Sequence, residues 1–180
     1  MGLLKLASIW FGGCSGCHMS FLDLDEFLIT LAEKAEIVFS PVVDRKDYPQ
    51  GVDVCLIEGA ICNEENLHLA KIVRERTKVV VSFGDCAVTG NVPAMRNPFR
   101  TASVVLDRSY LENGDLNAVI PAEPGILPVL VDRVTPVHEV IPVDFYIPGC
   151  PPPAPRIREV LEQLLAHEPA HLSGRGIKFG

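Results

Sequence analysis

Apolar residues fall along this chain in five short runs, separated by polar segments in which apolar positions recur at helical spacing. The runs are rich in β-branched residues and are bounded by glycine, proline or polar turns, which is typical of buried β-strands. They cover residues 3–11, 36–43, 52–61, 78–84 and 143–149. The pattern therefore predicts five strands, with helices in the segments between and after them.

Three segments carry helix signals. Ser20 and Asp23 have the spacing of a capping box, so the first helix is expected to begin at Ser20. Asn63 is placed to cap a second helix over 64–76, which has acidic residues in its first turn and basic residues in its last. A third helix follows the prolines at 151–155, because proline is tolerated at a helix start.

The order of these elements predicts the fold class. Strands that alternate with helices imply right-handed crossovers and a parallel sheet covered on both faces. We therefore expect an α/β, flavodoxin-like fold with a mainly parallel five-stranded sheet and helices on both faces, forming a single domain over 1–180. Residues 86–142 have many prolines and weak periodicity, and they predict no regular element beyond a turn at 112–115.

Composition and charge narrow the class of protein. The chain has 180 residues, of which 48% are hydrophobic and 22% are charged, the balance of a folded domain. The net charge is −7 and no basic stripe stands out, so no nucleic-acid partner is expected. No apolar stretch approaches the ~20 residues of a membrane span. The start carries neither a signal-peptide pattern nor a twin-arginine pair, so a cytoplasmic location is expected.

Six cysteines in such a chain point toward metal or thiol chemistry rather than disulfides. Cys14 and Cys17 follow the first predicted strand, Cys86 follows the fourth and Cys150 follows the fifth. Carboxyl ends of parallel strands share one sheet edge, where ligands of such sheets bind. Four thiolates at one edge suit zinc or an iron–sulfur cluster, and one close pair with two distant single cysteines fits a cluster better. The close pair alone would also suit a thiol–disulfide enzyme.

Four further residues require a choice between a structural role and a functional one. Cys55 lies inside the third strand and is expected to be a buried core thiol. Cys62 follows that run at the same edge, so the spacing does not exclude it as a substitute ligand. Glu58 either bonds to backbone at the strand end or serves proton transfer or a partner, and His18 is expected to be a partly exposed histidine at a helix start rather than a ligand.

Nucleotide-binding motifs are missing from the sequence. The segment "GGCSGC" stands where a flavodoxin-like domain has a Ser/Thr-rich phosphate loop, and neither GxGxxG nor GxxxxGK[ST] occurs. We therefore expect no nucleotide to bind to this chain itself.

Several motifs, taken together, resemble the small subunit of nickel–iron hydrogenases. They are "CSGCHMS" (14–20), "VCLIEGAI" (54–61), "GDCAVTG" (84–90), "PVHEVIPVD" (136–144) and "PGCPPPAPRI" (148–157). The flanks "WFGGCSGCHMSFLDLDE" and "GNVPAMRNP" are similar to those of the cytoplasmic, bidirectional NAD-reducing hydrogenases.

The resemblance implies a single 4Fe-4S cluster held by Cys14, Cys17, Cys86 and Cys150. It also implies a hydrogenase large subunit that carries the nickel–iron centre, and diaphorase subunits that carry FMN and reduce NAD, so that this chain transfers electrons but is not catalytic alone. The chain ends 30 residues after Cys150, where many relatives continue with further cluster cysteines. One cluster is therefore expected.

Other functions remain open at this point. The chain could be the cluster subunit of another hydrogenase or of a complex I-like quinone reductase, although the latter usually has adjacent cysteines where this chain has Cys14-Ser-Gly-Cys17. A thiol–disulfide enzyme using Cys14 and Cys17, a hydrogen sensor and a scaffold subunit are the remaining alternatives.

Overall fold

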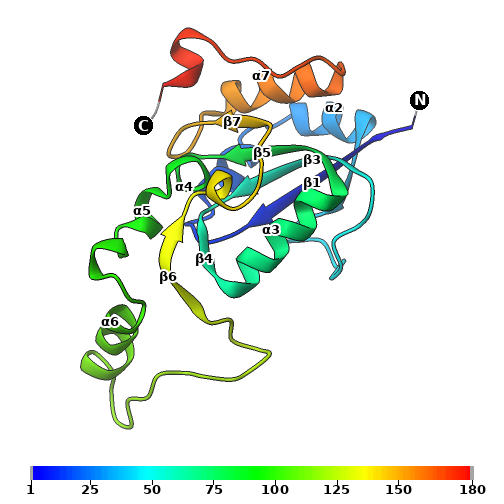
Figure 1. Cartoon of the computed structure of the whole chain (residues 1–180). Helices are drawn as coiled ribbons and strands as arrows, with labels where there is room; N and C mark the ends of the chain where they lie inside the picture. The colour runs from blue at the N-terminus through cyan, green and yellow to red at the C-terminus, as the bar shows by residue number, and fades with distance from the viewer. Residues whose placement is uncertain (1, 179–180) are drawn as a thin grey trace.

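A five-stranded parallel sheet forms the centre of the protein, seen in a computed structural model that describes residues 2–178 (Figure 1). Its strands are β1 (Leu4–Trp10), β2 (Ala35–Phe39), β3 (Val52–Glu58), β5 (Thr77–Phe83) and β7 (Phe145–Ile147). They pair in the order β2-β1-β3-β5-β7, and every pairing is parallel. This is the strand order of flavodoxin-like sheets, so the predicted fold class is confirmed.

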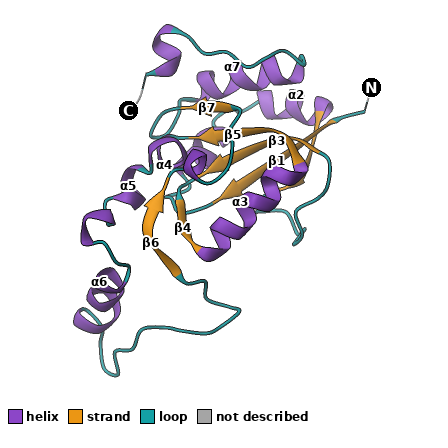
Figure 2. Cartoon of the chain, viewed as in Figure 1, coloured by secondary structure: helices purple, strands orange, loops and turns teal. Residues whose placement is uncertain are grey.

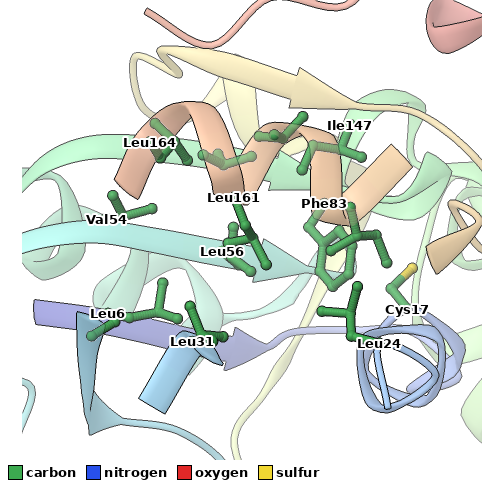
Figure 3. Packing of buried hydrophobic residues seen from close by; sticks show 14 of the residues in the cluster. Leu6, Cys17, Leu24, Leu31, Val54, Leu56, Phe83, Ile147, Leu161 and Leu164 are labelled. Atoms are coloured by element: carbon green, nitrogen blue, oxygen red, sulfur yellow. The ribbon is translucent and has the colours of Figure 1, made fainter. Parts of the chain in front are cut away.

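Helices cover both faces of the sheet, as expected. On one face, α1 (Gly16–Leu22), α2 (Phe27–Lys34) and α7 (Ala154–Leu165) pack on β1, β3 and β5. Figure 3 shows this core, with Leu161 and Leu164 of α7 beside Leu56 and Val54. On the other face, α3 (Glu64–Arg76) and α4 (Asp85–Thr89) bury a second apolar cluster against the same strands.

The first helix differs from its prediction. It begins at Gly16, after Ser15 in a left-handed conformation (φ 62°), and it ends at Leu22 before a short turn leads into α2. Ser20 does not cap it; the Ser20 hydroxyl is buried and donates to the Pro152 carbonyl at 2.6 Å. The capping-box prediction was wrong because this hydroxyl bonds to a distant loop instead of to its own helix.

The second helix agrees with its prediction in detail. Helix α3 covers Glu64–Arg76, and the Asn63 side chain accepts a hydrogen bond from the Asn66 backbone N–H at 2.8 Å. Such a cap satisfies one of the N–H groups that a helix start leaves without a partner.

Four predicted strands are shorter in the structure, the first by one residue at each end, since β1 covers Leu4–Trp10. The run expected over 52–61 ends at Glu58, because the chain turns at Gly59 (φ 89°) and then forms the separate strand β4 (Ile61–Asn63). Strand β2 ends at Phe39, two residues before Pro41. Strand β7 begins only at Phe145, since the Asp144 carboxylate accepts the Val80 N–H at its start.

The segment over 86–142 contains regular structure that its sequence did not predict. Strand β6 (Leu130–Thr135) pairs with β4 in a separate antiparallel sheet. Short helices precede β6: α5 (Asn91–Ala94), the 3-10 turn Asn97–Phe99, α6 (Ser103–Leu106) and the π-helical turn Asp107–Glu112. Further 3-10 turns lie at Val137–Glu139 and Gly174–Ile177. Figure 2 shows α6 and the long loop before β6 extending away from the central sheet.

Within residues 2–178, no helix combines the length and the apolar character that crossing a membrane requires.

Candidate functional site

Four cysteine thiols lie together at the carboxyl ends of the central strands. Cys14 follows β1 and Cys17 lies in α1, whereas Cys86 lies in α4 directly after β5 and Cys150 follows β7. Burial and then the Glu58 carboxylate raise the pKa of Cys17 far above its usual value, and each of the other three thiols raises it further. Charges act on one another in this way only at short range. The structure thus brings the four predicted residues to one place.

The four thiols differ in their access to solvent. Cys17 is buried at the end of the apolar core, beside Phe83 and Leu24 (Figure 3), whereas Cys14 and Cys150 are exposed. Cys86 is half-buried, and burial followed by the neighbouring Cys150 thiol raises its pKa to about 11. The site therefore has an inner wall of protein and an outer side that a partner can reach.

Glycines let the backbone approach the thiols closely. Gly84 has a φ of 86°, and a Cβ atom there would lie only 2.1 Å from the Cys17 Sγ. A Cβ atom at Gly16 would lie 3.2 Å from the Cys14 Sγ. Only glycine combines this conformation at residue 84 with this contact, so strand β5 can end directly against the Cys17 sulfur.

A buried aspartate links two of the cysteine loops. The Asp85 backbone N–H donates to the Gly149 carbonyl at 2.9 Å, and the Gly149 N–H donates to the Asp85 Oδ1 at 2.6 Å. Asp85 is 8% exposed. The only sequence signal for Asp85 is its place immediately before Cys86, a predicted ligand at the sheet edge.

Hydrogen-bond donors approach two of the sulfur atoms. The Asn91 side-chain amide donates to the Cys150 Sγ at 3.4 Å, and the Val92 backbone N–H bonds to Cys86 and lowers its pKa in part. The Val92 donor favours the thiolate form of Cys86, which is the form that binds metal. No sequence signal pointed to Asn91, because its role depends on the turn between α4 and α5.

The side chains of Glu58 and His18 contact each other next to Cys17. The Glu58 side chain is 3% exposed and accepts hydrogen bonds from the backbone N–H groups of Cys17 (3.3 Å) and His18 (2.9 Å), and it also bonds to the His18 Nδ1. The contacts of Glu58 therefore match the backbone-bonding reading of this strand-end acid.

His18 lies at the helix start, as expected, but it is more buried than exposed. Its side chain is 16% exposed and packs edge-on against the rings of Trp10 and Phe83. The His18 Nε2 is buried and has no hydrogen-bond partner among the described residues. His18 and Ser8 both line a cavity of about 30 Å³.

The two remaining cysteines lie apart from the site. Cys55 is fully buried in β3, which confirms it as a core thiol. Cys62 lies in β4, with its Sγ against Gly12, and the charged group that acts on it is Arg96 rather than another cysteine. The structure does not bring Cys62 together with the other four thiols.

The donor set fits an iron–sulfur cluster. Four cysteines from three segments supply the four thiolates that such clusters take, and glycines let the backbone approach two of the sulfurs closely. In residues 2–178, no group of three or more His, Cys, Asp or Glu side chains is arranged to hold a single metal ion.

The fold and the cysteine edge define a flavodoxin-like α/β protein with a thiol site at the carboxyl ends of its strands. Residues 14–164 match the family described as the NADH ubiquinone oxidoreductase 20 Kd subunit. The match covers most of the chain, so the protein belongs to this family.

Similar relatives are hydrogenase subunits. The chain is 38% identical over 175 residues to the NAD-reducing hydrogenase HoxS subunit delta of Cupriavidus necator, covering 95% of this chain and 83% of that one. It is 41% identical over 174 residues to a chain of the F420-non-reducing hydrogenase of Methanothermobacter marburgensis, covering 94% of its own length. It spans only 56% of that relative and of the corresponding hydrogenase chain of Methanothermobacter thermautotrophicus.

Solved structures agree with these relatives. A chain of an NAD+-reducing [NiFe]-hydrogenase in the H2-reduced state superimposes with a TM-score of 0.93 at 35% identity, covering 99% of this chain and 100% of that one. A [NiFeSe]-hydrogenase chain from Dm. baculatum, at 16% identity and a TM-score of 0.60, shares the fold. The resemblance to hydrogenase small subunits is thereby confirmed.

Proposed function

We propose that this chain is the electron-transfer small subunit of a NAD-reducing nickel–iron hydrogenase, with one 4Fe-4S cluster in a single domain over 1–180. The cluster ligands in this proposal are Cys14, Cys17, Cys86 and Cys150. The observation that carries it is the meeting of these four thiols at one sheet edge, on a fold that superimposes with a NAD+-reducing [NiFe]-hydrogenase chain. When bound, the cluster supplies a one-electron relay.

Residues of this chain prepare the site for that relay. Strand ends and the Asp85–Gly149 bonds fix the cysteine loops relative to one another, which keeps the reorganisation of the ligands small. The Asn91 and Val92 donors stabilise negative charge on sulfur. The core residues around Cys17 exclude water from the inner side of the site.

The partners in this proposal are a hydrogenase large subunit with the nickel–iron centre and diaphorase subunits with FMN. Together they would catalyse H2 + NAD+ = H+ + NADH in the cytoplasm. Support comes from the exposed apolar side chains that follow Asn91 along the chain, which include Val92, Met95 and Phe99. Exposed apolar surface that follows, along the chain, a residue in contact with Cys150 is consistent with an interface, and we assign the large subunit to residues 86–100 and 121–137.

A complex I-like quinone reductase is the second candidate, because the matching family is described by a subunit of NADH ubiquinone oxidoreductase. The thiol–disulfide alternative is weaker. A dithiol enzyme would need only Cys14 and Cys17, whereas the structure brings Cys86 and Cys150 to the same site.

Metal analysis tests the cluster. The full chain, purified anaerobically with its co-expressed large subunit, should contain about four sulfide and, besides the iron of the large subunit's nickel–iron centre, about four iron per chain. Replacing Cys150 by Ser should abolish or strongly reduce that content. Cys62→Ser is the matched control and should retain it. Zinc in place of iron, or loss of iron in Cys62→Ser but not in Cys150→Ser, would contradict the assignment.

The acceptor test separates the two complexes. Hydrogen oxidation by the purified complex should reduce NAD in the absence of quinone. Reduction of a soluble quinone at the expense of NADH, without hydrogen turnover, would favour the second candidate instead.

A further inference from the structure

Glu58 takes the place of a helix cap for α1, although it belongs to a different element. The N-cap residue of α1, Ser15, makes no side-chain capping bond. The first N–H groups of a helix have no partner within it, and here the N–H groups of Cys17 and His18 donate to the Glu58 carboxylate at the end of β3. The carboxylate thus connects the central sheet to the turn that carries Cys14 and Cys17.

The burial of Glu58 shows how firmly this contact is fixed. Its side chain is 3% exposed, and a buried carboxylate is tolerated only when hydrogen bonds compensate for lost hydration. Two backbone N–H groups and the His18 Nδ1 provide them. Trp10 and Phe83 pack against the His18 ring, so the third donor is also held in place.

The carboxylate also acts on the site through its charge. It accepts the Cys17 N–H at 3.3 Å, so its negative charge lies next to this ligand, and additional negative charge there is disfavoured. Reduction of a bound cluster adds negative charge at the same place. A carboxylate there therefore favours the oxidised form.

We propose, building on the proposed function, that Glu58 is a positioning residue for the cluster: it fixes the turn of the cysteine pair and lowers the reduction potential of the bound cluster. The two effects have different requirements. Fixing the turn needs a hydrogen-bond acceptor, which glutamine also offers, whereas lowering the potential needs the negative charge.

Three variants of the full chain separate these effects after anaerobic reconstitution with iron and sulfide. Glu58→Gln should load the cluster and shift its midpoint potential to a more positive value in an EPR-monitored redox titration. Glu58→Ala loses both the acceptor and the charge, and its affinity for the cluster should fall by ~10-fold or more. Glu75→Gln removes an exposed acid on α3 and should change neither quantity.

The outcomes distinguish a failure of the Glu58 proposal from a failure of the proposed function on which it rests. Failure of the wild-type chain to load a cluster contradicts the proposed function. A loaded wild type, together with Glu58→Gln at the wild-type potential, overturns the role of the charge. Equal cluster affinity in Glu58→Ala and wild type overturns the role of the acceptor. If Glu58→Gln keeps its wild-type circular dichroism but loses the cluster, fixing of the turn requires the carboxylate itself.

Discussion

Asp85 and Gly149 are joined by two hydrogen bonds that run in opposite directions, with N···O distances of 2.9 and 2.6 Å. Each residue immediately precedes a cysteine of the site, Cys86 or Cys150. The pair therefore sets the distance between two loops that are 64 residues apart along the chain. Removing one partner leaves a buried donor without an acceptor, which costs more than the bond itself contributes.

Replacing Asp85 by Ala should lower the free energy of unfolding by about 1–3 kcal/mol, because the Gly149 N–H loses its acceptor inside the protein. Urea unfolding of the metal-free chain measures the change. Asp85→Asn is the control, since its amide oxygen can still accept from Gly149, and it should recover most of the loss. Equal loss in both variants would show that the charge, and not the hydrogen bond, stabilises the loops.

Gly84 should not tolerate a side chain. Gly84→Ala would place a Cβ atom 2.1 Å from the Cys17 Sγ in a conformation (φ 86°) that L-residues rarely adopt. We expect the free energy of unfolding to fall by more than the about 1–3 kcal/mol that the backbone strain alone costs. We also expect the Cys17 thiol to be displaced. Iron content and urea unfolding would measure both effects.

Gly125 provides the matched control for that substitution. It has a similar φ of 82°, but a Cβ atom there would meet no atom within 4 Å. Gly125→Ala should therefore lower the free energy of unfolding only by the cost of the backbone strain, and it should leave the iron content unchanged. The prediction for Gly84 would be contradicted if both variants lost the same stability and retained the same iron.

The sheet and its cysteine edge could be predicted because they depend on local patterns and one topological rule. Each strand is an apolar run closed by glycine or proline, and parallel strands must end at a common edge. That rule was sufficient to bring Cys86 and Cys150 to the Cys14–Cys17 turn without any contact being known.

Other features depend on partners that are remote in sequence. Ser20 resembles a helix cap, but its hydroxyl bonds to the Pro152 carbonyl 132 residues away. The apolar periodicity of α1 and α2 continues across the turn between them, so the break is invisible in the pattern. The pairing of β4 with β6 joins two short segments of weak strand character, and the Glu58–His18 contact requires the packed fold.

Asn91 should raise the reduction potential of the proposed cluster, because its amide N–H donates to the Cys150 Sγ and stabilises added negative charge. Asn91→Ala should therefore lower the midpoint potential, by up to about 59 mV if the bond changes the one-electron equilibrium tenfold. An EPR-monitored redox titration measures it. Asn113→Ala, which removes an amide from an exposed loop position, should leave the potential unchanged. A higher potential in Asn91→Ala would contradict this role.

Met95 should lie in the proposed interface with the large subunit. Its side chain is 73% exposed, and the residue lies shortly after Asn91, whose side chain contacts Cys150, along the chain. Met95→Asp should weaken the complex by about 2 kcal/mol, or ~30-fold in Kd, which is typical of a charge placed at an interface centre. Sedimentation or titration of the variant with the purified large subunit measures the Kd.

Val42 is the control for Met95. It is 86% exposed but lies in the loop after β2, outside the segments assigned to the interface. Val42→Asp should bind the large subunit like wild type. Equal weakening by the two variants would place the interface elsewhere.

Cys55 should make the stability of the metal-free chain depend on alkaline pH. Burial raises the pKa of its thiol from 9.0 to about 12, although a hydrogen bond with Tyr48 lowers it in part. Between these pH values the unfolded chain has released the proton while the folded chain retains it. The contribution of the protonated Cys55 thiol to the free energy of unfolding is therefore complete below pH 9. It is lost as the pH rises toward about 12, by at most ~1.4 kcal/mol per pH unit.

Urea unfolding at pH 8, 9, 10 and 11 tests this dependence. Cys55→Ala removes the titrating thiol, so its free energy of unfolding should fall less steeply with pH above 9 than that of wild type. Val54→Ala, at the neighbouring buried position, removes apolar volume without a titrating group. It should be less stable at every pH by a constant amount and keep the wild-type slope. Because only the slope carries the effect of the thiol, a wild-type slope in Cys55→Ala would assign the alkaline loss of stability to other groups.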